Sequence, residues 1–252
     1  MKIELASFYK GIKPDIQRKI TTEIFNTSTA DLILFAGHTI LNIKDLEWLS
    51  NQVENKKTTC FLELKNFGVR EATNWLFKIE NGKLINCNTN QIFATSKDIN
   101  DNIYCAEKLI HELKTTRKYS INGKNLLILM CGELNILKNI QSQGNTVQFR
   151  IKNPSLQKEF RTLLEDAHII LNPLHTPMGN QGKMEKRRVY LSKSKRYYFS
   201  TANLEASSTN KFREKEFQRK KLHYGFYDGK EISIEEIPYR TTPNFIIREF
   251  SI

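Results

Sequence analysis

The stretch of sequence that decides the fold is Asn125-Leu-Leu-Ile-Leu-Met-Cys131-Gly-Glu133. Its apolar run lies between the polar pairs Gly123-Lys124 and Gly132-Glu133, a pattern that predicts a strand buried on both faces. Open α/β sheets place their chemistry just beyond the carboxyl ends of such strands. Cys131 therefore stands where a nucleophile would be held, next to a glycine that lets backbone and substrate approach closely. The alternative is a buried thiol without chemistry, because free cysteine is among the most buried residue types.

Strand and helix patterns alternate along most of the chain, which predicts an α/β fold. Isoleucines four residues apart indicate a half-buried helix over 14–26, and the turn Asn81-Gly82 indicates a hairpin. The expected strands are 2–8, 30–38, 58–64, 75–80, 83–86, 125–131, 146–151, 167–173 and 196–203, with 91–94 continuing the first hairpin, a second hairpin at 227–234 and a final apolar segment at 244–252. The expected helices are 14–26, 43–52, 106–115, 156–165 and 183–195. Because no repeat or low-complexity tract divides the chain, we expect one domain over residues 1–252.

The composition excludes several classes of protein. A chain of 252 residues with 39% hydrophobic residues can bury a core. No window approaches the ~18 consecutive apolar residues of a membrane span, and the N-terminus lacks the apolar centre of a signal peptide. The four cysteines form no C-x-x-C pair, so we expect reduced thiols and a cytoplasmic protein. No Cys or His pair has zinc-finger spacing, and no metal is expected.

The net charge of +12 is concentrated in one segment. Between Lys183 and Lys221 there are 13 Lys or Arg against 4 Glu, a local balance of +9. Cations interleaved with aromatic residues suit a nucleic-acid surface, where phosphate contacts give affinity and rings stack on bases. The alternative is a solvated basic face that binds an acidic partner or aids solubility. No helix-turn-helix, zinc-finger or ribonucleoprotein signature accompanies the segment.

Four patches of sequence resemble the nitrilase (carbon–nitrogen hydrolase) superfamily in their order and spacing. They are the strand 30–35, the hairpin turn 81–85 with Phe93-Ala-Thr-Ser-Lys97, the stretch Leu127-Ile-Leu-Met-Cys131-Gly-Glu133, and 166–173 with Arg187-Arg188 and Tyr198-Phe-Ser-Thr-Ala-Asn203. The resemblance covers roughly residues 1–205. It implies a nitrilase-like α-β-β-α sandwich in a single domain, a small-molecule amide or nitrile substrate, and no cofactor. It also implies a homo-oligomer, because members of the family commonly pair.

The resemblance implies three catalytic groups. In the family a thiol attacks the amide or nitrile carbon, a glutamate takes the thiol proton, and a lysine stabilises the oxyanion. Cys131 matches the nucleophile, and Lys97, 34 residues upstream, matches the oxyanion stabiliser. A positioned cation favours the thiolate and offsets the charge that develops in the transition state. An exposed loop lysine is the alternative interpretation of Lys97.

The glutamate of the family has no counterpart here. Where the family has proline-glutamate, this chain has Ala36-Gly37-His38, and glycine cannot move a proton. His38 could replace the base, because imidazole titrates near neutral pH; a hydrogen-bonded histidine at a strand end is the alternative. The carboxylate candidates are Glu133, whose counterpart in the family positions rather than abstracts, together with Glu107, Glu112 and Glu63.

Two functions from different classes follow. The first is a thiol-dependent amide or nitrile hydrolase with Cys131 and Lys97 in the roles above, Glu133 beside them, and His38 or a carboxylate as an altered base. The second is a nitrilase-like binding or assembly module that has lost catalysis and uses segment 183–221 as its contact surface. The loops at 66–74 and 175–182 are expected to set the specificity of the pocket.

Overall fold

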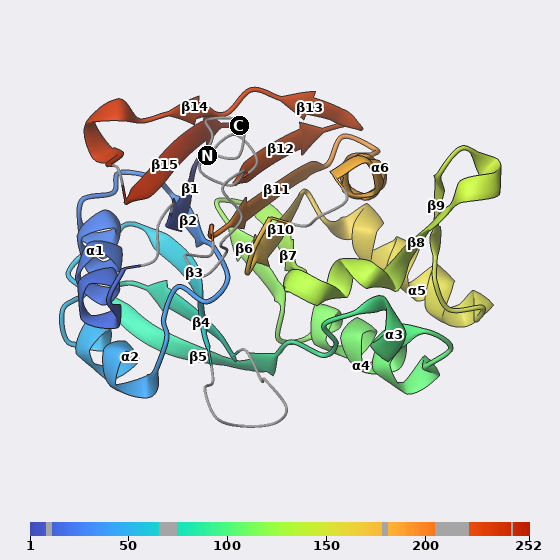
Figure 1. Cartoon of the computed structure of the whole chain (residues 1–252), viewed down its shortest axis with the longest axis horizontal. Helices are drawn as coiled ribbons and strands as arrows, with labels where there is room; N and C mark the ends of the chain where they lie inside the picture. The colour runs from blue at the N-terminus through green and yellow to red at the C-terminus, as the bar shows by residue number, and fades with distance from the viewer. Residues whose placement is uncertain (9–11, 66–74, 178–180, 205–221, 243) are drawn as a thin grey trace.

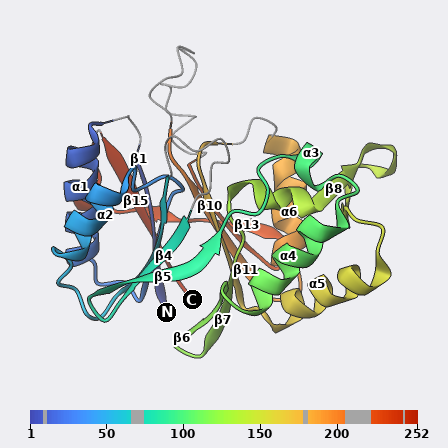
Figure 2. The same ribbon diagram turned by 90° about the horizontal axis from the view of Figure 1, so that it is seen from below.

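The structure is a computed structural model of the chain, and it describes residues 1–8, 12–65, 75–177, 181–204, 222–242 and 244–252. Two mixed β-sheets pack face to face, and helices cover the outer face of each sheet (Figures 1 and 2). The layers therefore run α-β-β-α, and the nitrilase-like sandwich expected from the sequence is confirmed. No helix within the described ranges is long and apolar enough to cross a membrane.

The first sheet contains both ends of the chain. Its seven described strands lie in the order β14-β15-β1-β2-β3-β4-β5. They are β1 (Lys2–Phe8), β2 (Leu32–Phe35), β3 (Thr59–Leu64), β4 (Trp75–Glu80), β5 (Lys83–Asn90), β14 (Glu235–Glu236) and β15 (Phe245–Ser251). Strands β1, β2 and β3 are parallel, and α1 (Pro14–Asn26) and α2 (Ile43–Ser50) cover their outer face. Strand β15 pairs antiparallel with β1, so the last residues of the chain complete the sheet that the first ones begin.

The second sheet carries the Cys131 strand. Its order in the described chain is β13-β12-β11-β10-β7-β6. The strands are β6 (Lys118–Ile121), β7 (Lys124–Ile128), β10 (Ile169–Leu174), β11 (Tyr197–Ala202), β12 (His223–Tyr227) and β13 (Lys230–Ile232). Its outer side is covered by α3 (Ser96–Ile99), α4 (Ile103–Lys114), α5 (Pro154–Asp166) and α6 (Gln181–Ser192), and β8 (Leu137–Ile140) and β9 (Thr146–Phe149) form a separate hairpin. The 3-10 helices are η1 (Cys131–Ile136), η2 (Gln141–Gln143) and η4 (Pro238–Arg240).

The continuous apolar runs of the sequence are explained by the space between the sheets. Strands that are covered on both faces cannot alternate apolar with polar residues. The layer between the sheets consists of Ile3, Leu5, Leu32, Leu34, Phe61 and Leu76 from the first sheet and Leu126, Ile128, Met130, Ile169, Leu171 and Phe199 from the second. A further apolar cluster lies between the first sheet and its helices, and another lies between the second sheet and its helices.

Several boundaries differ from the sequence prediction, and two of the differences depend on Glu133. The Cys131 strand ends earlier than expected, because the backbone N–H of Met130 donates to the Glu133 carboxylate (2.8 Å) and the chain turns into η1. The prediction that 91–94 continues the first hairpin is wrong. The N–H of Ile92 also donates to Glu133 (2.8 Å) instead of to a neighbouring strand, and β5 ends at Asn90.

A buried polar contact joins the two sheets. The Ser7 hydroxyl of β1 lies 2.6 Å from the Thr201 hydroxyl of β11 and 2.8 Å from Nε2 of His223 in β12. His223 is 4% exposed, and its Nδ1 has no hydrogen-bond partner. Burial, together with the positive charge of Arg248, holds the pKa of His223 well below its usual value of 6.5.

We expect His223 to make the fold sensitive to acid. The folded protein keeps the imidazole neutral, whereas the unfolded chain binds a proton near pH 6.5. Because the unfolded state then holds more protons, the free energy of unfolding should fall as the pH drops below about 6.5. Urea denaturation between about pH 5 and 7 measures this slope, which His223→Gln should flatten and the exposed His111→Gln should leave unchanged. Equal slopes for wild type and His223→Gln would contradict the assignment.

Candidate active site

Cys131 and His175 reach the same edge of the second sheet on neighbouring strands. Cys131 begins η1 three residues after the end of β7, and His175 directly follows β10, which pairs parallel with β7. Parallel neighbours present their carboxyl ends on one side of a sheet, so the two residues meet. The backbone N–H of His175 lies 3.4 Å from Sγ of the half-buried Cys131, which is a free thiol.

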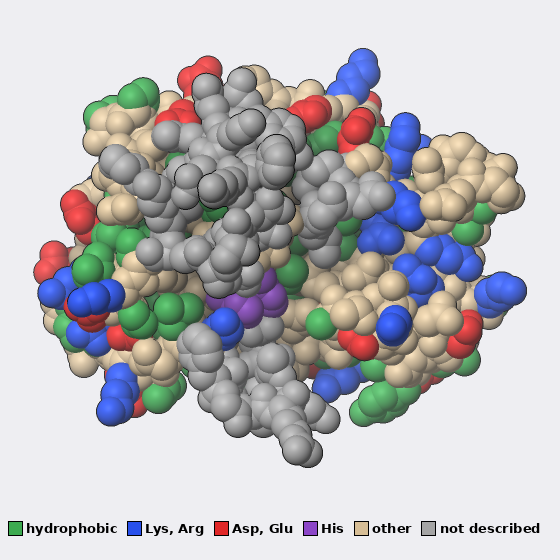
Figure 3. All heavy atoms as spheres, viewed as in Figure 1, with side chains coloured by type: hydrophobic (Ala, Val, Ile, Leu, Met, Phe, Trp, Pro, Cys, Tyr) green, Lys and Arg blue, Asp and Glu red, His purple; other side chains and the backbone are tan. Residues whose placement is uncertain are grey.

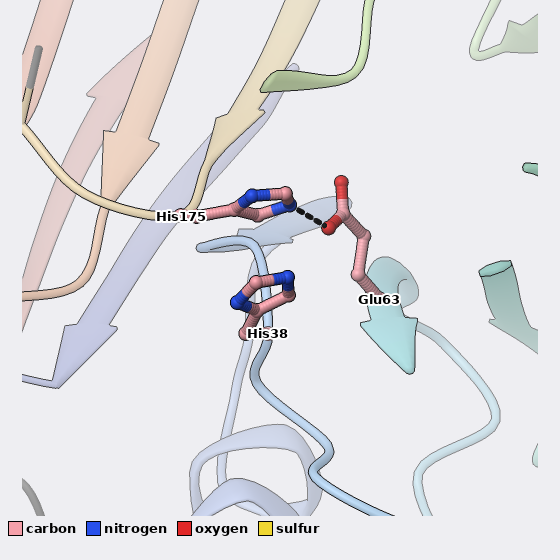
Figure 4. Close-up of side chains that lie close together, drawn as sticks. All are labelled: His38, Glu63 and His175. Carbon is pink, nitrogen blue, oxygen red and sulfur yellow. Dashed lines mark hydrogen bonds and ion pairs between the residues drawn. The ribbon is translucent and has the colours of Figure 1, made fainter. Parts of the chain in front are cut away.

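The imidazole of His175 lies against a carboxylate from the opposite sheet. Its Nε2 is 2.8 Å from Oε2 of Glu63, which comes from β3 (Figure 4). Glu63 is 0% exposed, and its other carboxylate oxygen, Oε1, has no hydrogen-bond partner. Glu63 is among the carboxylates that the sequence offers as a base. Its contact, however, is with His175, which the sequence places in the loop 175–182 expected to set specificity.

The surroundings of His175 favour its charged form. Burial lowers the pKa of His175, but the Glu63 carboxylate and the Cys131 thiol outweigh burial and raise the pKa to about 10. The imidazole therefore carries a positive charge at neutral pH. Because Nε2 faces Glu63, a proton exchange with Cys131 would have to use the other ring nitrogen, Nδ1.

Gly37 provides the space that His175 occupies. The N–H of Gly37 donates to the carbonyl of Leu174 (3.0 Å), which joins the end of β2 to the end of β10. A Cβ on Gly37 would lie 2.4 Å from Cδ2 of His175 and 3.0 Å from Oε2 of Glu63. A side chain at position 37 and the observed His175 therefore exclude each other.

The comparisons with known proteins agree with this geometry at the level of the fold. No protein-family model matches the sequence, and no curated protein matches it either. Among solved structures, an amidase from Nesterenkonia sp. is 9% identical, with a TM-score of 0.56 over 99% of this chain and 90% of that chain. A CN-hydrolase superfamily protein from Xanthomonas campestris is 10% identical, with a TM-score of 0.52 over 100% and 91% of the two chains.

The fold is that of the carbon–nitrogen hydrolase superfamily. A glutamine-dependent NAD(+) synthetase from Cytophaga hutchinsonii also contains it: this chain aligns over 99% of its length with 42% of that longer chain, at 10% identity and a TM-score of 0.54. One structure of the Nesterenkonia amidase is a complex with butyramide. In another, the acetamide moiety of fluoroacetamide is attached to the active-site cysteine of that enzyme.

On this carbon–nitrogen hydrolase fold, His38 lies beside His175. Its ring stacks on His175, with centroids 3.5 Å apart and planes 14° from parallel (Figure 4). The backbone of His38 is left-handed (φ 60°), and Asn203 secures the turn by donating to the carbonyl of Gly37 (2.9 Å). The structure thus places His38 as a support for the His175 ring.

Glu133 shapes the turn that presents Cys131. It forms a fully buried ion pair with Arg117, and both side chains are 0% exposed. One carboxylate oxygen accepts from the N–H of Ile92 and the other from the N–H of Met130, each at 2.8 Å. With both oxygens engaged, this carboxylate holds the backbone on either side of the turn that contains Cys131.

The remaining candidates do not contact Cys131 in the described structure. Lys97 is exposed on α3, and its ammonium group forms no ion pair or hydrogen bond with a described residue. The backbone that precedes α3 is nevertheless close to the residue after Cys131, because a Cβ on Gly132 would lie 2.4 Å from Cα of Ala94. Glu107 is exposed, and the carboxylate of Glu112 accepts from the hydroxyl of Thr116.

His38, Glu63 and His175 also form a set of side chains that could hold a metal ion by composition. Their ligand atoms lie within 4.8 Å of one another. However, nitrogen lone pairs lie in the plane of an imidazole, and the two rings are stacked and nearly parallel. The lone pairs of the two rings therefore lie in parallel planes and do not converge on one metal position. The side chains do not form the tetrahedral arrangement that zinc prefers. As they lie, these residues fit a metal ion poorly.

The basic segment is less exposed than its sequence indicates. In its described part, Arg187, Arg188 and Arg196 are 8%, 1% and 5% exposed. Arg188 lies over the ring of Tyr224 (3.6 Å), and Arg196 donates to the carbonyls of Leu191 and Leu164. Arg188 and Arg196 therefore pack α6 and the start of β11 onto the protein. The second basic run, 211–221, and the proposed specificity residues 66–74 and 178–180 lie outside the described residues.

Proposed function

We propose that this protein is a cysteine hydrolase of a C–N bond in a small amide or nitrile, with Cys131 as nucleophile and His175 as its proton-transfer group. One observation carries the proposal: His175 stands between the nucleophile and a buried carboxylate, with its backbone N–H 3.4 Å from Sγ of Cys131 and its Nε2 2.8 Å from Oε2 of Glu63. Interactions with both residues raise the pKa of its side chain. Nucleophile, base and orienting carboxylate in contact are the arrangement of a thiol-dependent acyl transferase or hydrolase. The unusual feature is that the base comes from β10 and not from the end of β2.

The same contacts supply each proton transfer of amide hydrolysis. The deprotonated sulfur of Cys131 attacks the carbonyl carbon and forms a tetrahedral intermediate with a negative oxygen. The imidazolium of His175 gives its proton to the leaving nitrogen, the C–N bond breaks, and an acyl thioester remains. The neutral imidazole then takes a proton from the attacking water, which releases the carboxylic acid and restores the starting pair. Glu63 stabilises the imidazolium and fixes its orientation throughout.

Lys97 and Glu133 keep the roles that the sequence suggested within this proposal. Glu133 fixes the backbone of the nucleophile turn through its hydrogen bonds to Met130 and Ile92. Lys97 is the proposed oxyanion group, and the packing of α3 against η1 supports it. A bound substrate would have to draw its exposed side chain over Cys131.

The proposal is tested by ammonia release from small primary amides and the corresponding nitriles. We expect turnover by the wild type, and for Cys131→Ala a loss to the level of the uncatalysed reaction, because no thioester can form. Cys105→Ala, which removes a half-buried thiol in α4, is the matched control and should keep full activity. Hydrolysis that survives in Cys131→Ala would overturn the proposal. Iodoacetamide labelling followed by mass spectrometry should independently find Cys131 to be the fastest-reacting thiol.

A further inference from the structure

Two arginines share one asparagine beside η1. Arg150, which follows β9, donates from Nε to the carbonyl of Asn135 (2.6 Å) and from Nη2 to the carbonyl of Leu137 (3.4 Å). Arg187 of α6 donates from Nη1 to the side-chain oxygen of the same Asn135 (3.0 Å). Its other contacts are the Leu134 carbonyl (3.2 Å) and Oδ1 of Asn139 (3.0 Å). Two guanidinium groups are thus held against a single residue by neutral oxygens.

No carboxylate neutralises these two charges. Within the described chain neither arginine forms an ion pair. Asp101 raises the pKa of Arg150 through its charge without forming an ion pair with it. Burial and the charge of Arg150 lower the pKa of Arg187 to about 10, and burial also lowers the pKa of Arg150. Desolvated like charges near each other destabilise the site until an anion lies between them.

The pair still has hydrogen-bond donors to offer. Nη1 of Arg150 and Nη2 of Arg187 make no hydrogen bond to any described residue, and neither is among the buried atoms that lack a partner. Lys and Arg side chains gather on this part of the molecule, over α6 and β8, as the right-hand half of Figure 3 shows. The local field therefore attracts anions, and the two guanidinium groups supply directed donors for one.

We propose that Arg150 and Arg187 form a binding site for a dianionic phosphate group, as inorganic phosphate or a phosphate monoester. Two fixed guanidinium charges match two negative charges, and their planar forks match the oxygens of a phosphate. Arginine is built for such contacts because it stays charged and its donors are pre-oriented. The site is distinct from the contact between Cys131 and His175, but both lie against η1. Asn135, which both arginines contact, belongs to that helix, and its Nδ2 donates to the carbonyl of Gly132 (2.9 Å).

Calorimetric titration with inorganic phosphate at low ionic strength tests the proposal without reference to hydrolysis. We expect saturable binding to the wild type, and binding at least about tenfold weaker for Arg150→Gln, which removes a charge-assisted donor from a half-buried position. Arg187→Lys keeps the charge but loses the fork, and should weaken binding similarly if circular dichroism shows that it folds. Lys186→Gln, an exposed neighbour on α6, removes one charge without touching the site and should bind as the wild type does.

Three results would overturn it. Absence of phosphate binding to the wild type would do so directly. Equal weakening in Lys186→Gln would show that phosphate only screens the net positive charge. Equal binding of acetate at matched ionic strength would show that the pair does not select a dianion. Whether a phosphate monoester binds more tightly than inorganic phosphate then distinguishes the two sources of the same group.

Discussion

His175→Asn is expected to lower kcat/KM for amide hydrolysis by about 10²–10⁴, the usual contribution of a positioned acid–base group. Asparagine keeps the polarity and much of the size of the side chain, so the packing around Glu63 should survive while proton transfer to the leaving nitrogen is lost. Steady-state kinetics of ammonia release measure the effect. His38→Phe is the matched control, since it keeps an aromatic ring stacked on His175 and removes the other imidazole.

The pH profile separates a chemical role of His175 from a structural one. Because the pKa of His175 is raised to about 10, the imidazolium is present below that pH and is lost as the pH rises through it. Wild-type kcat/KM should therefore decline near pH 10, and the residual activity of His175→Asn should lack this decline. If His38→Phe loses as much activity as His175→Asn, the base is His38 and our assignment is wrong.

Gly37→Glu, which places a glutamate where the resemblance predicts one, is expected to inactivate the protein and to destabilise it by about 1–3 kcal/mol. The reason is steric, because the new Cβ would lie 2.4 Å from Cδ2 of His175, closer than side chains approach, and overpacking of a filled site carries a cost of this order. The shift of the urea midpoint measures the free energy of unfolding.

The double variant Gly37→Glu/His175→Gly makes this prediction sharper. Removing the imidazole vacates the space that the glutamate needs, so the second substitution should recover stability that the first one lost. The two changes must then be non-additive, as is usual for residues in contact. Additive losses in the double variant would contradict the view that position 37 and His175 compete for one space. Recovery of amide hydrolysis would show further that a glutamate in that space can serve as the base.

Local signals determined most of the fold. The turn Asn81-Gly82 adopts the left-handed backbone that its residues favour (φ 54° and 70°), and the apolar runs at 32–35 and 169–174 are strands buried on both faces. The extent of β5 and β7 was missed, because both end where their backbone donates to the carboxylate of Glu133. That carboxylate reaches Ile92 from 41 positions away, which no local pattern records.

Local patterns in the sequence determined the α/β class and the strand that leads to Cys131, because apolar runs and turn residues act between neighbours in the chain. The sandwich was expected only from the resemblance to a known family. Only the tertiary structure decided what accompanies the sulfur. His175 and Glu63 are 112 positions apart and come from different sheets, so their contact exists only once the sheets have packed face to face. The sequence showed a glycine where a glutamate was expected. The structure shows that this glycine makes room for the histidine that we propose as the base in its place.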